Sequence, residues 1–431
     1  MTTQQPQVDN DGDHHHHQQQ DTPSEEEEPP VLPRPTKSEV QSCQFSHWYP
    51  TFRSIPKSSI QNTTNYKLRK NVTIESNIIK PLPNEFIEYL LSDGVRLPRC
   101  AVRVSSCMKD DTTNTNDDGW NDSDDNDDDS SNEEVRQYNF PILTSQIQIA
   151  LENLGGNCMP KLNWSSPKDA TWMNCGTLKC TKVGDVYLLL KSSEFVSFDL
   201  ERAWDDLEPA IAVEGEAVEN DQGNDDGKPP KDFEYELVLR KWCNLHPSME
   251  FRCFIYNHEL IAISQRHPTK FYSHLQLSDE DEVHPTTDII HAFFETYVQR
   301  RFASGKMHRY VMDVYVDSQE RTWVVDFNVW GSRTDALLFD WVELMGIGER
   351  VRDVEKDIGE NGGEEVDAEI PMPELRVVTK DMKDLTYDPL SSFRGPTDVM
   401  NLMGAGNNDD GGFEPSSFKN FMEQCVRPSE M

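Results

Sequence analysis

Apolar and polar residues alternate most regularly near residue 320 of this chain. The alternation predicts two strands, Arg309–Asp317 and Thr322–Val329, joined by a short polar turn at Ser318–Arg321. Successive side chains of a strand point to opposite faces, so one face of this hairpin should be apolar. That face is predicted to be buried through Trp323, Val325 and Phe327.

The other face of the predicted hairpin carries acidic and amide side chains. If Asp317 pairs with Thr322, Asp313 lies opposite Asp326, and Asn328 points to the same face. Opposed carboxylates repel, so removing one should stabilise the ligand-free protein slightly unless a cation lies between them. Two carboxylates and an amide oxygen form a ligand set that suits Mg²⁺ beside phosphates. The alternative is a hairpin whose polar face is simply hydrated.

The same reading of the pattern predicts further elements along the chain. Strands are predicted at Cys158–Trp164, Asp185–Lys191, Tyr235–Trp242, Glu250–Tyr256 and Glu259–Gln265, with a two-residue turn at Asn257-His258. Helices are predicted at Pro83–Leu91, at Leu143–Leu154 with Thr144 or Ser145 as N-cap, at Val283–Phe302, and around Leu337–Met345. Clustered strands with helices between them indicate an α+β fold with antiparallel sheets and flanking helices.

Charge divides the chain into one folded region and several acidic segments. Of 431 residues, 77 are acidic and 41 basic, giving a net charge of -36. The polar and acidic stretches lack the apolar content to form a core, so we expect a disordered tract at 1–38, acidic disordered inserts at about 110–134 and 205–231, and a largely disordered acidic tail at 348–431. The folded domain is therefore predicted at 39–347.

Composition also argues against several classes of partner. A chain this acidic should repel nucleic acid, and it has no apolar run of the ~20 residues that a membrane span needs. Its nine cysteines are scattered and form no CxxC pair, which is typical of reduced thiols in an intracellular protein. We expect a cytoplasmic monomer that binds neither nucleic acid nor membrane.

Several cations fall within the predicted strands. Cations in strands are costly to bury without a partner, so their number suggests an anionic ligand; edge positions or snorkelling side chains are the alternative. They are Lys161, Lys191, Arg240, Lys241, Arg252 and Arg266. A simple turn at Asn257-His258 would put Arg252 and Arg266 on opposite faces, so both could reach one ligand only through a bulge or from beyond the strand end.

Familiar nucleotide motifs are missing. The chain has no GxxxxGK[ST] and no GxGxxG following a strand, so neither a P-loop nor a Rossmann site is expected. It also lacks the HRD and DFG motifs of protein kinases and the GxSxG elbow.

Six segments of the chain resemble the cell-division-cycle protein 123 family. They are Cys43–Tyr49, Pro160–Pro167, Tyr235–Cys243, Glu250–Phe254, Ile263–Arg266 and Val325–Asn328, within a resemblance that covers about residues 41–345. The chain departs from the family in its long N-terminal tract, the insert at 205–231 and Val329-Trp330 after the asparagine.

The resemblance implies an ATP-grasp-like fold that binds Mg-ATP. It implies an assembly chaperone that joins the gamma subunit of translation initiation factor 2 to its partner subunits, supporting translation initiation and cell-cycle progression. Carried over to this chain, the ATP pocket would comprise Lys161, Asn163, Trp164, Ser166, Arg240, Lys241, Trp242, Arg252 and Arg266. The magnesium ligands would be Asp313, Asp326 and Asn328.

Two other functions remain open from the sequence. The first is an ATP-grasp ligase that activates a carboxylate as an acyl phosphate, which needs a second substrate pocket that the sequence does not reveal. The second is an acidic calcium buffer, which the absence of a spaced DxDxDG loop disfavours. We expect a chaperone rather than an enzyme.

Overall fold

The computed structural model describes residues 32–56, 68–101, 138–208, 227–276, 284–360, 370–380 and 382, with side chains of the long last helix described as far as residue 356. The helices are α1 (Lys37–Ser42), α2 (Phe45–Arg53), α3 (Asn84–Leu91), α5 (Pro141–Asn153), α6 (Val183–Lys191), α7 (Glu194–Glu201), α8 (Pro285–Phe293) and α9 (Trp341–Glu360). The strands are β1 (Ser76–Ile79), β2 (Cys158–Leu162), β3 (Leu237–Lys241), β4 (Glu250–Tyr256), β5 (Glu259–Gln265), β6 (Arg309–Val316), β7 (Thr322–Asn328) and β8 (Glu374–Arg376).

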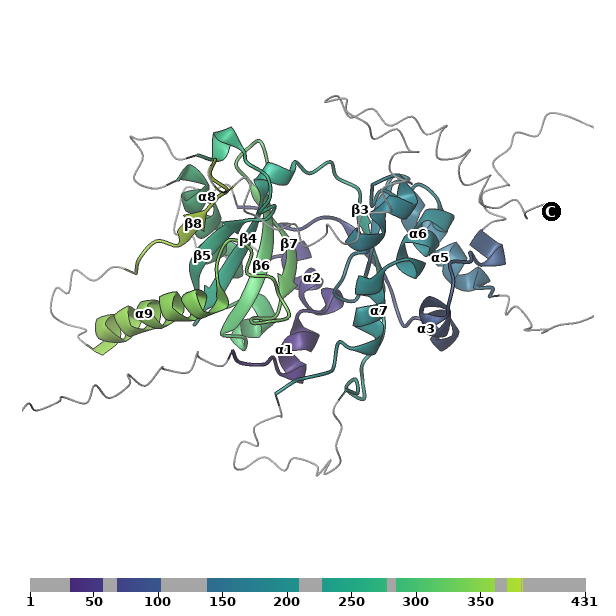
Figure 1. Ribbon diagram of the computed structural model, residues 1–431, viewed down its shortest axis with the longest axis horizontal. Helices are drawn as coiled ribbons and strands as arrows, with labels where there is room; N and C mark the ends of the chain where they lie inside the picture. Colours follow the sequence, from purple (N-terminus) through teal and green to yellow (C-terminus); the bar gives the residue numbers. More distant parts are fainter. Residues whose placement is uncertain are drawn as a thin grey trace, which may run out of the picture. The chain divides into compact units, whose positions relative to one another are not determined.

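The larger sheet has five strands in the order β7-β6-β4-β5-β8 (Figure 1). Its pairs are antiparallel, except that β8 runs parallel to β5. One face packs on α2, α8 and the 3-10 turn at Phe302–Gly305, and in the aromatic cluster there Phe327 stacks on Phe302 and contacts Trp48 and Phe52 of α2. This burial fixes which side chains of the sheet point to the opposite face.

The smaller sheet has three antiparallel strands in the order β1-β3-β2. Helices α3, α5, α6 and α7 gather beside it (Figure 1), and a second apolar core joins them to the sheet. Leu237 and Leu239 of β3 enter this core, while Val238 on the other face enters the core of the larger sheet. The α+β class with antiparallel sheets is as predicted.

The hairpin pairs Asp313 with Asp326 as predicted, but by a different register. The strands end on Val316 opposite Thr322, one residue short of the predicted Asp317 pair, and a bulge at Val325 restores the acidic pair. The bulge also turns Val325 away from the core, where Val324 takes its place at 0% exposure. Of the predicted apolar face, Phe327 is buried, whereas Trp323 and Val325 are half-buried.

A bulge also resolves the position of the two arginines. The register of β4 and β5 shifts between Phe254 and Ile255, which sets Arg252 opposite Ser264 rather than Ile263. Arg266 lies one residue beyond β5. The two-residue turn at Asn257-His258 is confirmed, and both of its residues have positive φ, as the tight turn of a hairpin requires.

The predicted strand at Asp185–Lys191 is wrong, because this segment belongs to helix α6. Its apolar run reads as a buried strand, but Val183, Val186, Tyr187, Leu189 and Leu190 are buried on one helix in the second core. Lys191 is therefore not a candidate for an anion site. Its Nζ donates to the carbonyls of Tyr89 and Leu90 at the end of α3, where the helix dipole favours a cation.

Two predicted helices differ in their ends. α5 begins at Pro141, which occupies the first turn, so neither Thr144 nor Ser145 is its N-cap. The helix predicted at Val283–Phe302 is α8 followed by a π-helical turn at Phe294–Val298. No helix among the described residues is long and apolar enough to cross a membrane.

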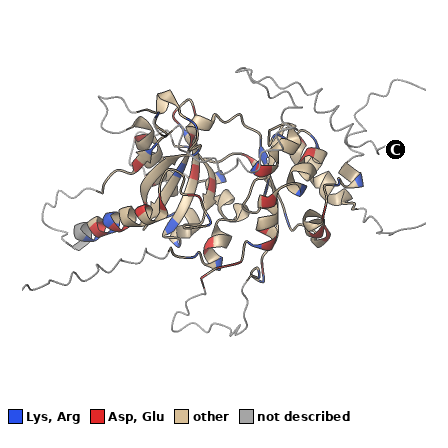
Figure 2. Cartoon of the chain, in the orientation of Figure 1, with Lys and Arg blue, Asp and Glu red and all other residues tan. Residues whose placement is uncertain are grey.

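The folded region extends further than predicted at both ends. Thr36 caps α1, so the fold starts before residue 39. At the other end α9 continues to Glu360 and mixes acidic and basic residues along its length (Figure 2). The tail is predicted to begin at 348, but the helix continues through Gly348, which admits the ring of Tyr256, a ring that would lie 2.4 Å from an added Cβ.

The acidic segments are only partly within the described residues. The insert predicted at 110–134 and most of the tail lie outside them, as do residues 209–226 of the second insert. The described start of that insert takes part in the fold, since Glu208 forms a bridge with Thr36 and the backbone carbonyl of Asp205 accepts from Arg333.

Candidate functional site

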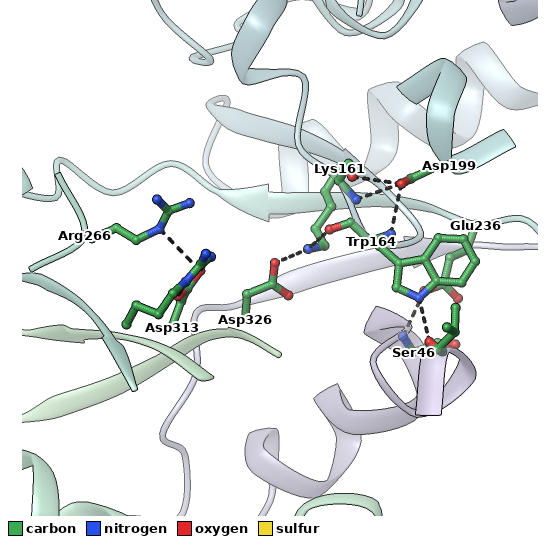
Figure 3. A network of polar contacts seen from close by, with 11 residues as sticks. Ser46, Lys161, Trp164, Asp199, Glu236, Arg266, Asp313 and Asp326 are labelled. Carbon is green, nitrogen blue, oxygen red and sulfur yellow. Dashed lines mark hydrogen bonds and ion pairs between the residues drawn. The ribbon is translucent and has the colours of Figure 1, made fainter. Parts of the chain in front are cut away.

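The carboxylate of Asp313 is held by two arginines of the larger sheet. Arg252 on neighbouring β4 donates from Nε and Nη2 to the two oxygens of Asp313, each at 2.8 Å. Arg266 lies 3.5 Å from the same carboxylate (Figure 3). Burial alone would raise the pKa of Asp313, but the two guanidinium groups hold it well below its usual range. Asp313 is therefore ionised and paired in the ligand-free protein.

The carboxylate of Asp326 is held from the smaller sheet instead. Lys161, on β2, is 1% exposed and donates from Nζ to Asp326 Oδ2 and to the Trp164 carbonyl (Figure 3). This ion pair links the two sheets across the space between them. The second oxygen, Oδ1, is buried and has no hydrogen-bond partner among the described residues.

The loop after β2 is held by hydrogen bonds to the β3 segment, to α2 and to α1. Asn163 has φ 26 and donates and accepts through its amide, with Glu234 and Glu236 of the β3 segment as partners. Its carbonyl accepts from Phe45 N at the start of α2. The Trp164 indole donates to the carbonyl of Val40 at 2.8 Å. Asn163 thus uses its side chain to shape the loop.

Asp199 holds the same loop from α7. Its carboxylate accepts from Trp164 N at 3.2 Å, from Ser165 N at 2.8 Å and from Ser165 Oγ at 2.8 Å (Figure 3). Burial, opposed by these hydrogen bonds, raises the pKa of Asp199 to about 7. Asp199 could not be found from the sequence, because it lies 34 or more residues from its partners in a helix with no recognisable motif.

One cavity collects most of the predicted site residues. Its lining includes side chains of both sheets and of the loop after β2, and it adjoins the Asp313 and Asp326 pairs. The residues predicted for a site that line it are Trp164, Ser166, Arg240, Arg252, Arg266, Asp313, Asp326 and Asn328. Lys161 reaches its edge through Asp326.

Besides Lys161, three predicted residues lie outside the lining of this cavity. Asn163 is buried beneath the loop, and Trp242 follows the end of β3. Lys241 is exposed and forms an ion pair with Glu75 at 3.5 Å. Alternation along β3 explains the contrast, since Arg240 points into the cavity and the next residue points away.

Arg240 is the least satisfied polar side chain of the cavity. It is 1% exposed and lies over the ring of Phe45, with 5.4 Å from the guanidinium carbon to the ring centre. Within the described part of the chain, its Nε and Nη2 have no hydrogen-bond partner, and neither does Nδ2 of Asn328. Burial lowers the pKa of Arg240. Unpaired buried donors of this kind indicate a missing acceptor.

Two further ionisable residues line the cavity that the sequence did not single out. Lys168 is exposed at the start of a 3-10 turn, Lys168–Asn174, and the charge of Arg266 lowers its pKa to about 8. Glu250 begins β4. Although burial opposes it, the neighbouring His267, Lys168 and Arg266 lower the pKa of Glu250. Lys168 directly follows the Pro160–Pro167 segment that carries the family resemblance, so a candidate segment extended by one residue would have included it.

The predicted magnesium ligands are brought together but are not a dense acidic cluster. Among the described residues, no group of three or more His, Cys, Asp or Glu could hold a metal. The predicted set contains two carboxylates and an amide, and each carboxylate already has a basic partner. Oδ1 of Asp326 has no hydrogen-bond partner among the described residues and could coordinate a metal, because Mg²⁺ prefers carboxylate oxygens.

Comparison with known proteins gives the family. The D123 family model matches residues 66–403. The chain belongs to the D123 family. A relative from Xenopus laevis, named translation initiation factor eIF2 assembly protein, is 35% identical over 374 residues, which is 85% of this chain and 92% of that protein. One from Phaeosphaeria nodorum, named cell division cycle protein 123, is 33% identical and covers 83% and 92%.

A solved structure is also similar to this chain. The C-terminally truncated Cdc123 of Schizosaccharomyces pombe matches with a TM-score of 0.53 and 30% identity, over 80% of this chain and 98% of that one. The match confirms the α+β fold with antiparallel sheets that the pattern predicted, and it gives this chain the fold of Cdc123.

Proposed function

We propose that this chain is a Mg-ATP-binding chaperone that promotes assembly of translation initiation factor 2 by binding its gamma subunit. The observation that carries the nucleotide part is the set of unpartnered polar atoms around one cavity: Arg240 Nε and Nη2, Asn328 Nδ2 and Asp326 Oδ1. Buried polar atoms are rarely left without partners, so a ligand with both acceptors and a metal would complete them.

The donors suit phosphate oxygens. Arg240, Arg252, Arg266 and Lys168 line the cavity, and Arg and Lys are the usual partners of phosphate groups. Asp326, Asn328 and Asp313 would hold magnesium, which when bound supplies positive charge that neutralises phosphate oxygens. The ion pair of Arg252 with Asp313 lowers the pKa of Asp313 and keeps it ionised in the absence of the metal, and Lys161 pairs with Asp326.

Support for the partner comes from the relatives. Proteins 35% identical to this chain over most of its length are named for assembly of the initiation factor eIF2. The gamma subunit is the finer expectation of the family resemblance. A cytoplasmic location and a monomeric state are part of the same proposal.

The nucleotide proposal is tested by thermal unfolding with and without Mg-ATP. A ligand that binds only the folded state stabilises it by about 2.7 kcal/mol at a hundredfold excess over Kd, so the wild type should show a clear rise in Tm. Asp326→Ala should lose most of this rise, while Asp232→Ala, an exposed carboxylate outside the cavity, should keep it. Equal rises in wild type and Asp326→Ala would remove Asp326 from the site.

The partner proposal needs a separate measurement. Purified gamma subunit should bind the full chain at micromolar concentration or tighter, and ATP should be turned over slowly or not at all. Absence of gamma-subunit binding would overturn the chaperone function. Rapid ADP formation that depends on an added carboxylic acid would favour the ATP-grasp ligase instead.

A further inference from the structure

Cys158 and Cys180 form a directly opposed pair of cysteines. Cys158 is the first residue of β2, and Cys180 lies shortly before α6. Their backbones exchange both hydrogen bonds of an antiparallel bridge, with 3.0 Å from Cys158 N to the Cys180 carbonyl and 2.8 Å from Cys180 N to the Cys158 carbonyl. Side chains of such a pair point to the same face, so the two thiols face each other.

This pair has the spacing that a disulfide needs. Opposed residues that exchange both hydrogen bonds have Cα atoms about 5.5 Å apart, within the range of roughly 4.4–6.8 Å that a disulfide spans. The two thiols also interact, because burial first, and then the hydrogen bond and charge of Cys158, raise the pKa of Cys180. Both side chains are 0% exposed and both thiols are free. Thiols held in this way can be joined with the backbone in place.

The arrangement is specific to these two cysteines. In the part of the chain that the structure describes, no other two cysteines are opposed in a strand or a bridge. Cys253, for example, lies in β4 opposite Ile263 and Met312. A chain with nine cysteines therefore places one pair of them in a geometry suited to a bond.

The segment before α6 gives a small oxidant a route to the pair. The neighbours of Cys180 in sequence, Lys179 and Thr181, are both exposed, so Cys180 lies just beneath the surface. Separating Cys180 from Cys158 breaks the two backbone hydrogen bonds of the bridge and leaves the pairing of β2 with β3 intact. Local openings of this kind expose buried groups without global unfolding. Cys180 is therefore the thiol that an oxidant reaches first.

We propose that Cys158 and Cys180 are an oxidation site, at which hydrogen peroxide converts the two thiols into a disulfide. The Cys180 sulfur attacks one peroxide oxygen and the O–O bond breaks, which gives a sulfenic acid and, with the proton of that thiol, one water. The Cys158 sulfur then attacks the Cys180 sulfur and the S–O bond breaks, which gives the disulfide and a second water. The two thiols lose two electrons and two protons, and the peroxide is reduced.

The disulfide would close the segment that carries the loop after β2. Trp164 and Ser166, which line the cavity, lie between the two cysteines in sequence. A cross-link between the ends of a segment restricts the unfolded chain, so the folded state with this loop in place becomes more stable. The oxidation requires no ligand in the cavity, so it is independent of the proposed nucleotide function.

The test is peptide mapping of the full chain after oxidation. The reduced protein is treated with hydrogen peroxide below its unfolding temperature, the remaining thiols are alkylated, and the protein is digested without a reductant. Mass spectrometry should find a peptide pair that links Cys158 to Cys180 and that disappears on reduction. The oxidised protein should have a Tm higher by at least about 3 °C, and dithiothreitol should abolish this rise.

Cys175 is the matched control, because its thiol is exposed in the same segment. Cys175→Ser should form the linked peptide as the wild type does, whereas Cys180→Ser should form none and show no rise in Tm. A link between Cys180 and Cys175, or a sulfinic acid at Cys180, would overturn the proposal. So would alkylation of both Cys158 and Cys180 in a sample whose Cys175 is fully oxidised. The peptide map of the wild type decides by itself if Cys180→Ser does not fold.

Discussion

The two sides of the cavity are built differently. The loop after β2 is held by hydrogen bonds. Its partners are the Asn163 side chain, the Asp199 carboxylate and the Val40 carbonyl. The β6–β7 hairpin instead presents two carboxylates that are paired with cations. Asp313 pairs with Arg252 of its own sheet, and Asp326 pairs with Lys161 of the smaller sheet. The loop is thus held by groups outside the cavity, whereas the hairpin carboxylates are held by cations, to which an anionic ligand would also bind.

The largest expected effect comes from Arg252 on the hairpin side. Arg252→Met would leave the buried carboxylate of Asp313 with only the distant Arg266, and breaking a buried ion pair costs about 3–5 kcal/mol. The free energy of unfolding, measured by urea denaturation, should fall by that amount. Adding Asp313→Asn should restore part of it, because the unpaired charge is then gone. A loss below about 1 kcal/mol would show that the pair is not buried in solution.

The link between the two sides is tested by Asp326. The opposed carboxylates alone suggest that Asp326→Ala stabilises the ligand-free protein, but its removal strands the buried ammonium of Lys161. We therefore expect a loss of about 2–3 kcal/mol in the free energy of unfolding. The double variant Asp326→Ala with Lys161→Met should be more stable than Asp326→Ala alone. Stabilisation by the single change would mean that repulsion from Asp313 outweighs the lysine pair.

The smallest effect concerns pH and the loop side. The pKa of Asp199 is about 7 in the fold and about 3.9 in an unfolded chain, so between these values the folded state binds an extra proton. Stability should then fall as pH rises through this window, by up to about 1.4 kcal/mol per pH unit. From pH 5.5 to 7, the wild type should lose about 1–2 kcal/mol relative to Asp199→Asn. Parallel curves for the two proteins would show that Asp199 does not titrate in this range.

Part of this site could be predicted from the sequence because strand alternation is local. The hairpin, its acidic pair and the tight turn between β4 and β5 all follow from patterns within about 20 residues. The bulges could not be predicted, because one extra residue in a strand leaves no mark on composition. The predicted register at the strand end, Asp317 opposite Thr322, differs by one residue from the observed one, Val316 opposite Thr322. The bulge at Val325 compensates for this difference, so Asp313 still pairs with Asp326 as predicted.

The remaining differences come from tertiary contacts. The apolar run at Val183–Lys191 suits a strand or a helix equally, and only its burial among α3, α5 and β2 decides. Likewise Gly348 weakens a helix by propensity alone, yet packing on Tyr256 carries α9 past it. Asp199 and Lys168 escaped notice because their roles depend on residues that are distant in sequence.

The short strand β8 has a consequence for how this chain can be handled. It covers the outer side of β5 by pairing with Ala262, Ile263 and Ser264, and Val378 N beyond it donates to the side chain of Gln265. A chain shortened before residue 374 would leave those backbone groups open at the border of the sheet, where other molecules can add as further strands. Such a fragment would tend to self-associate, and its aggregates could be mistaken for capture of a partner. A shortened version for binding studies should therefore end no earlier than residue 382.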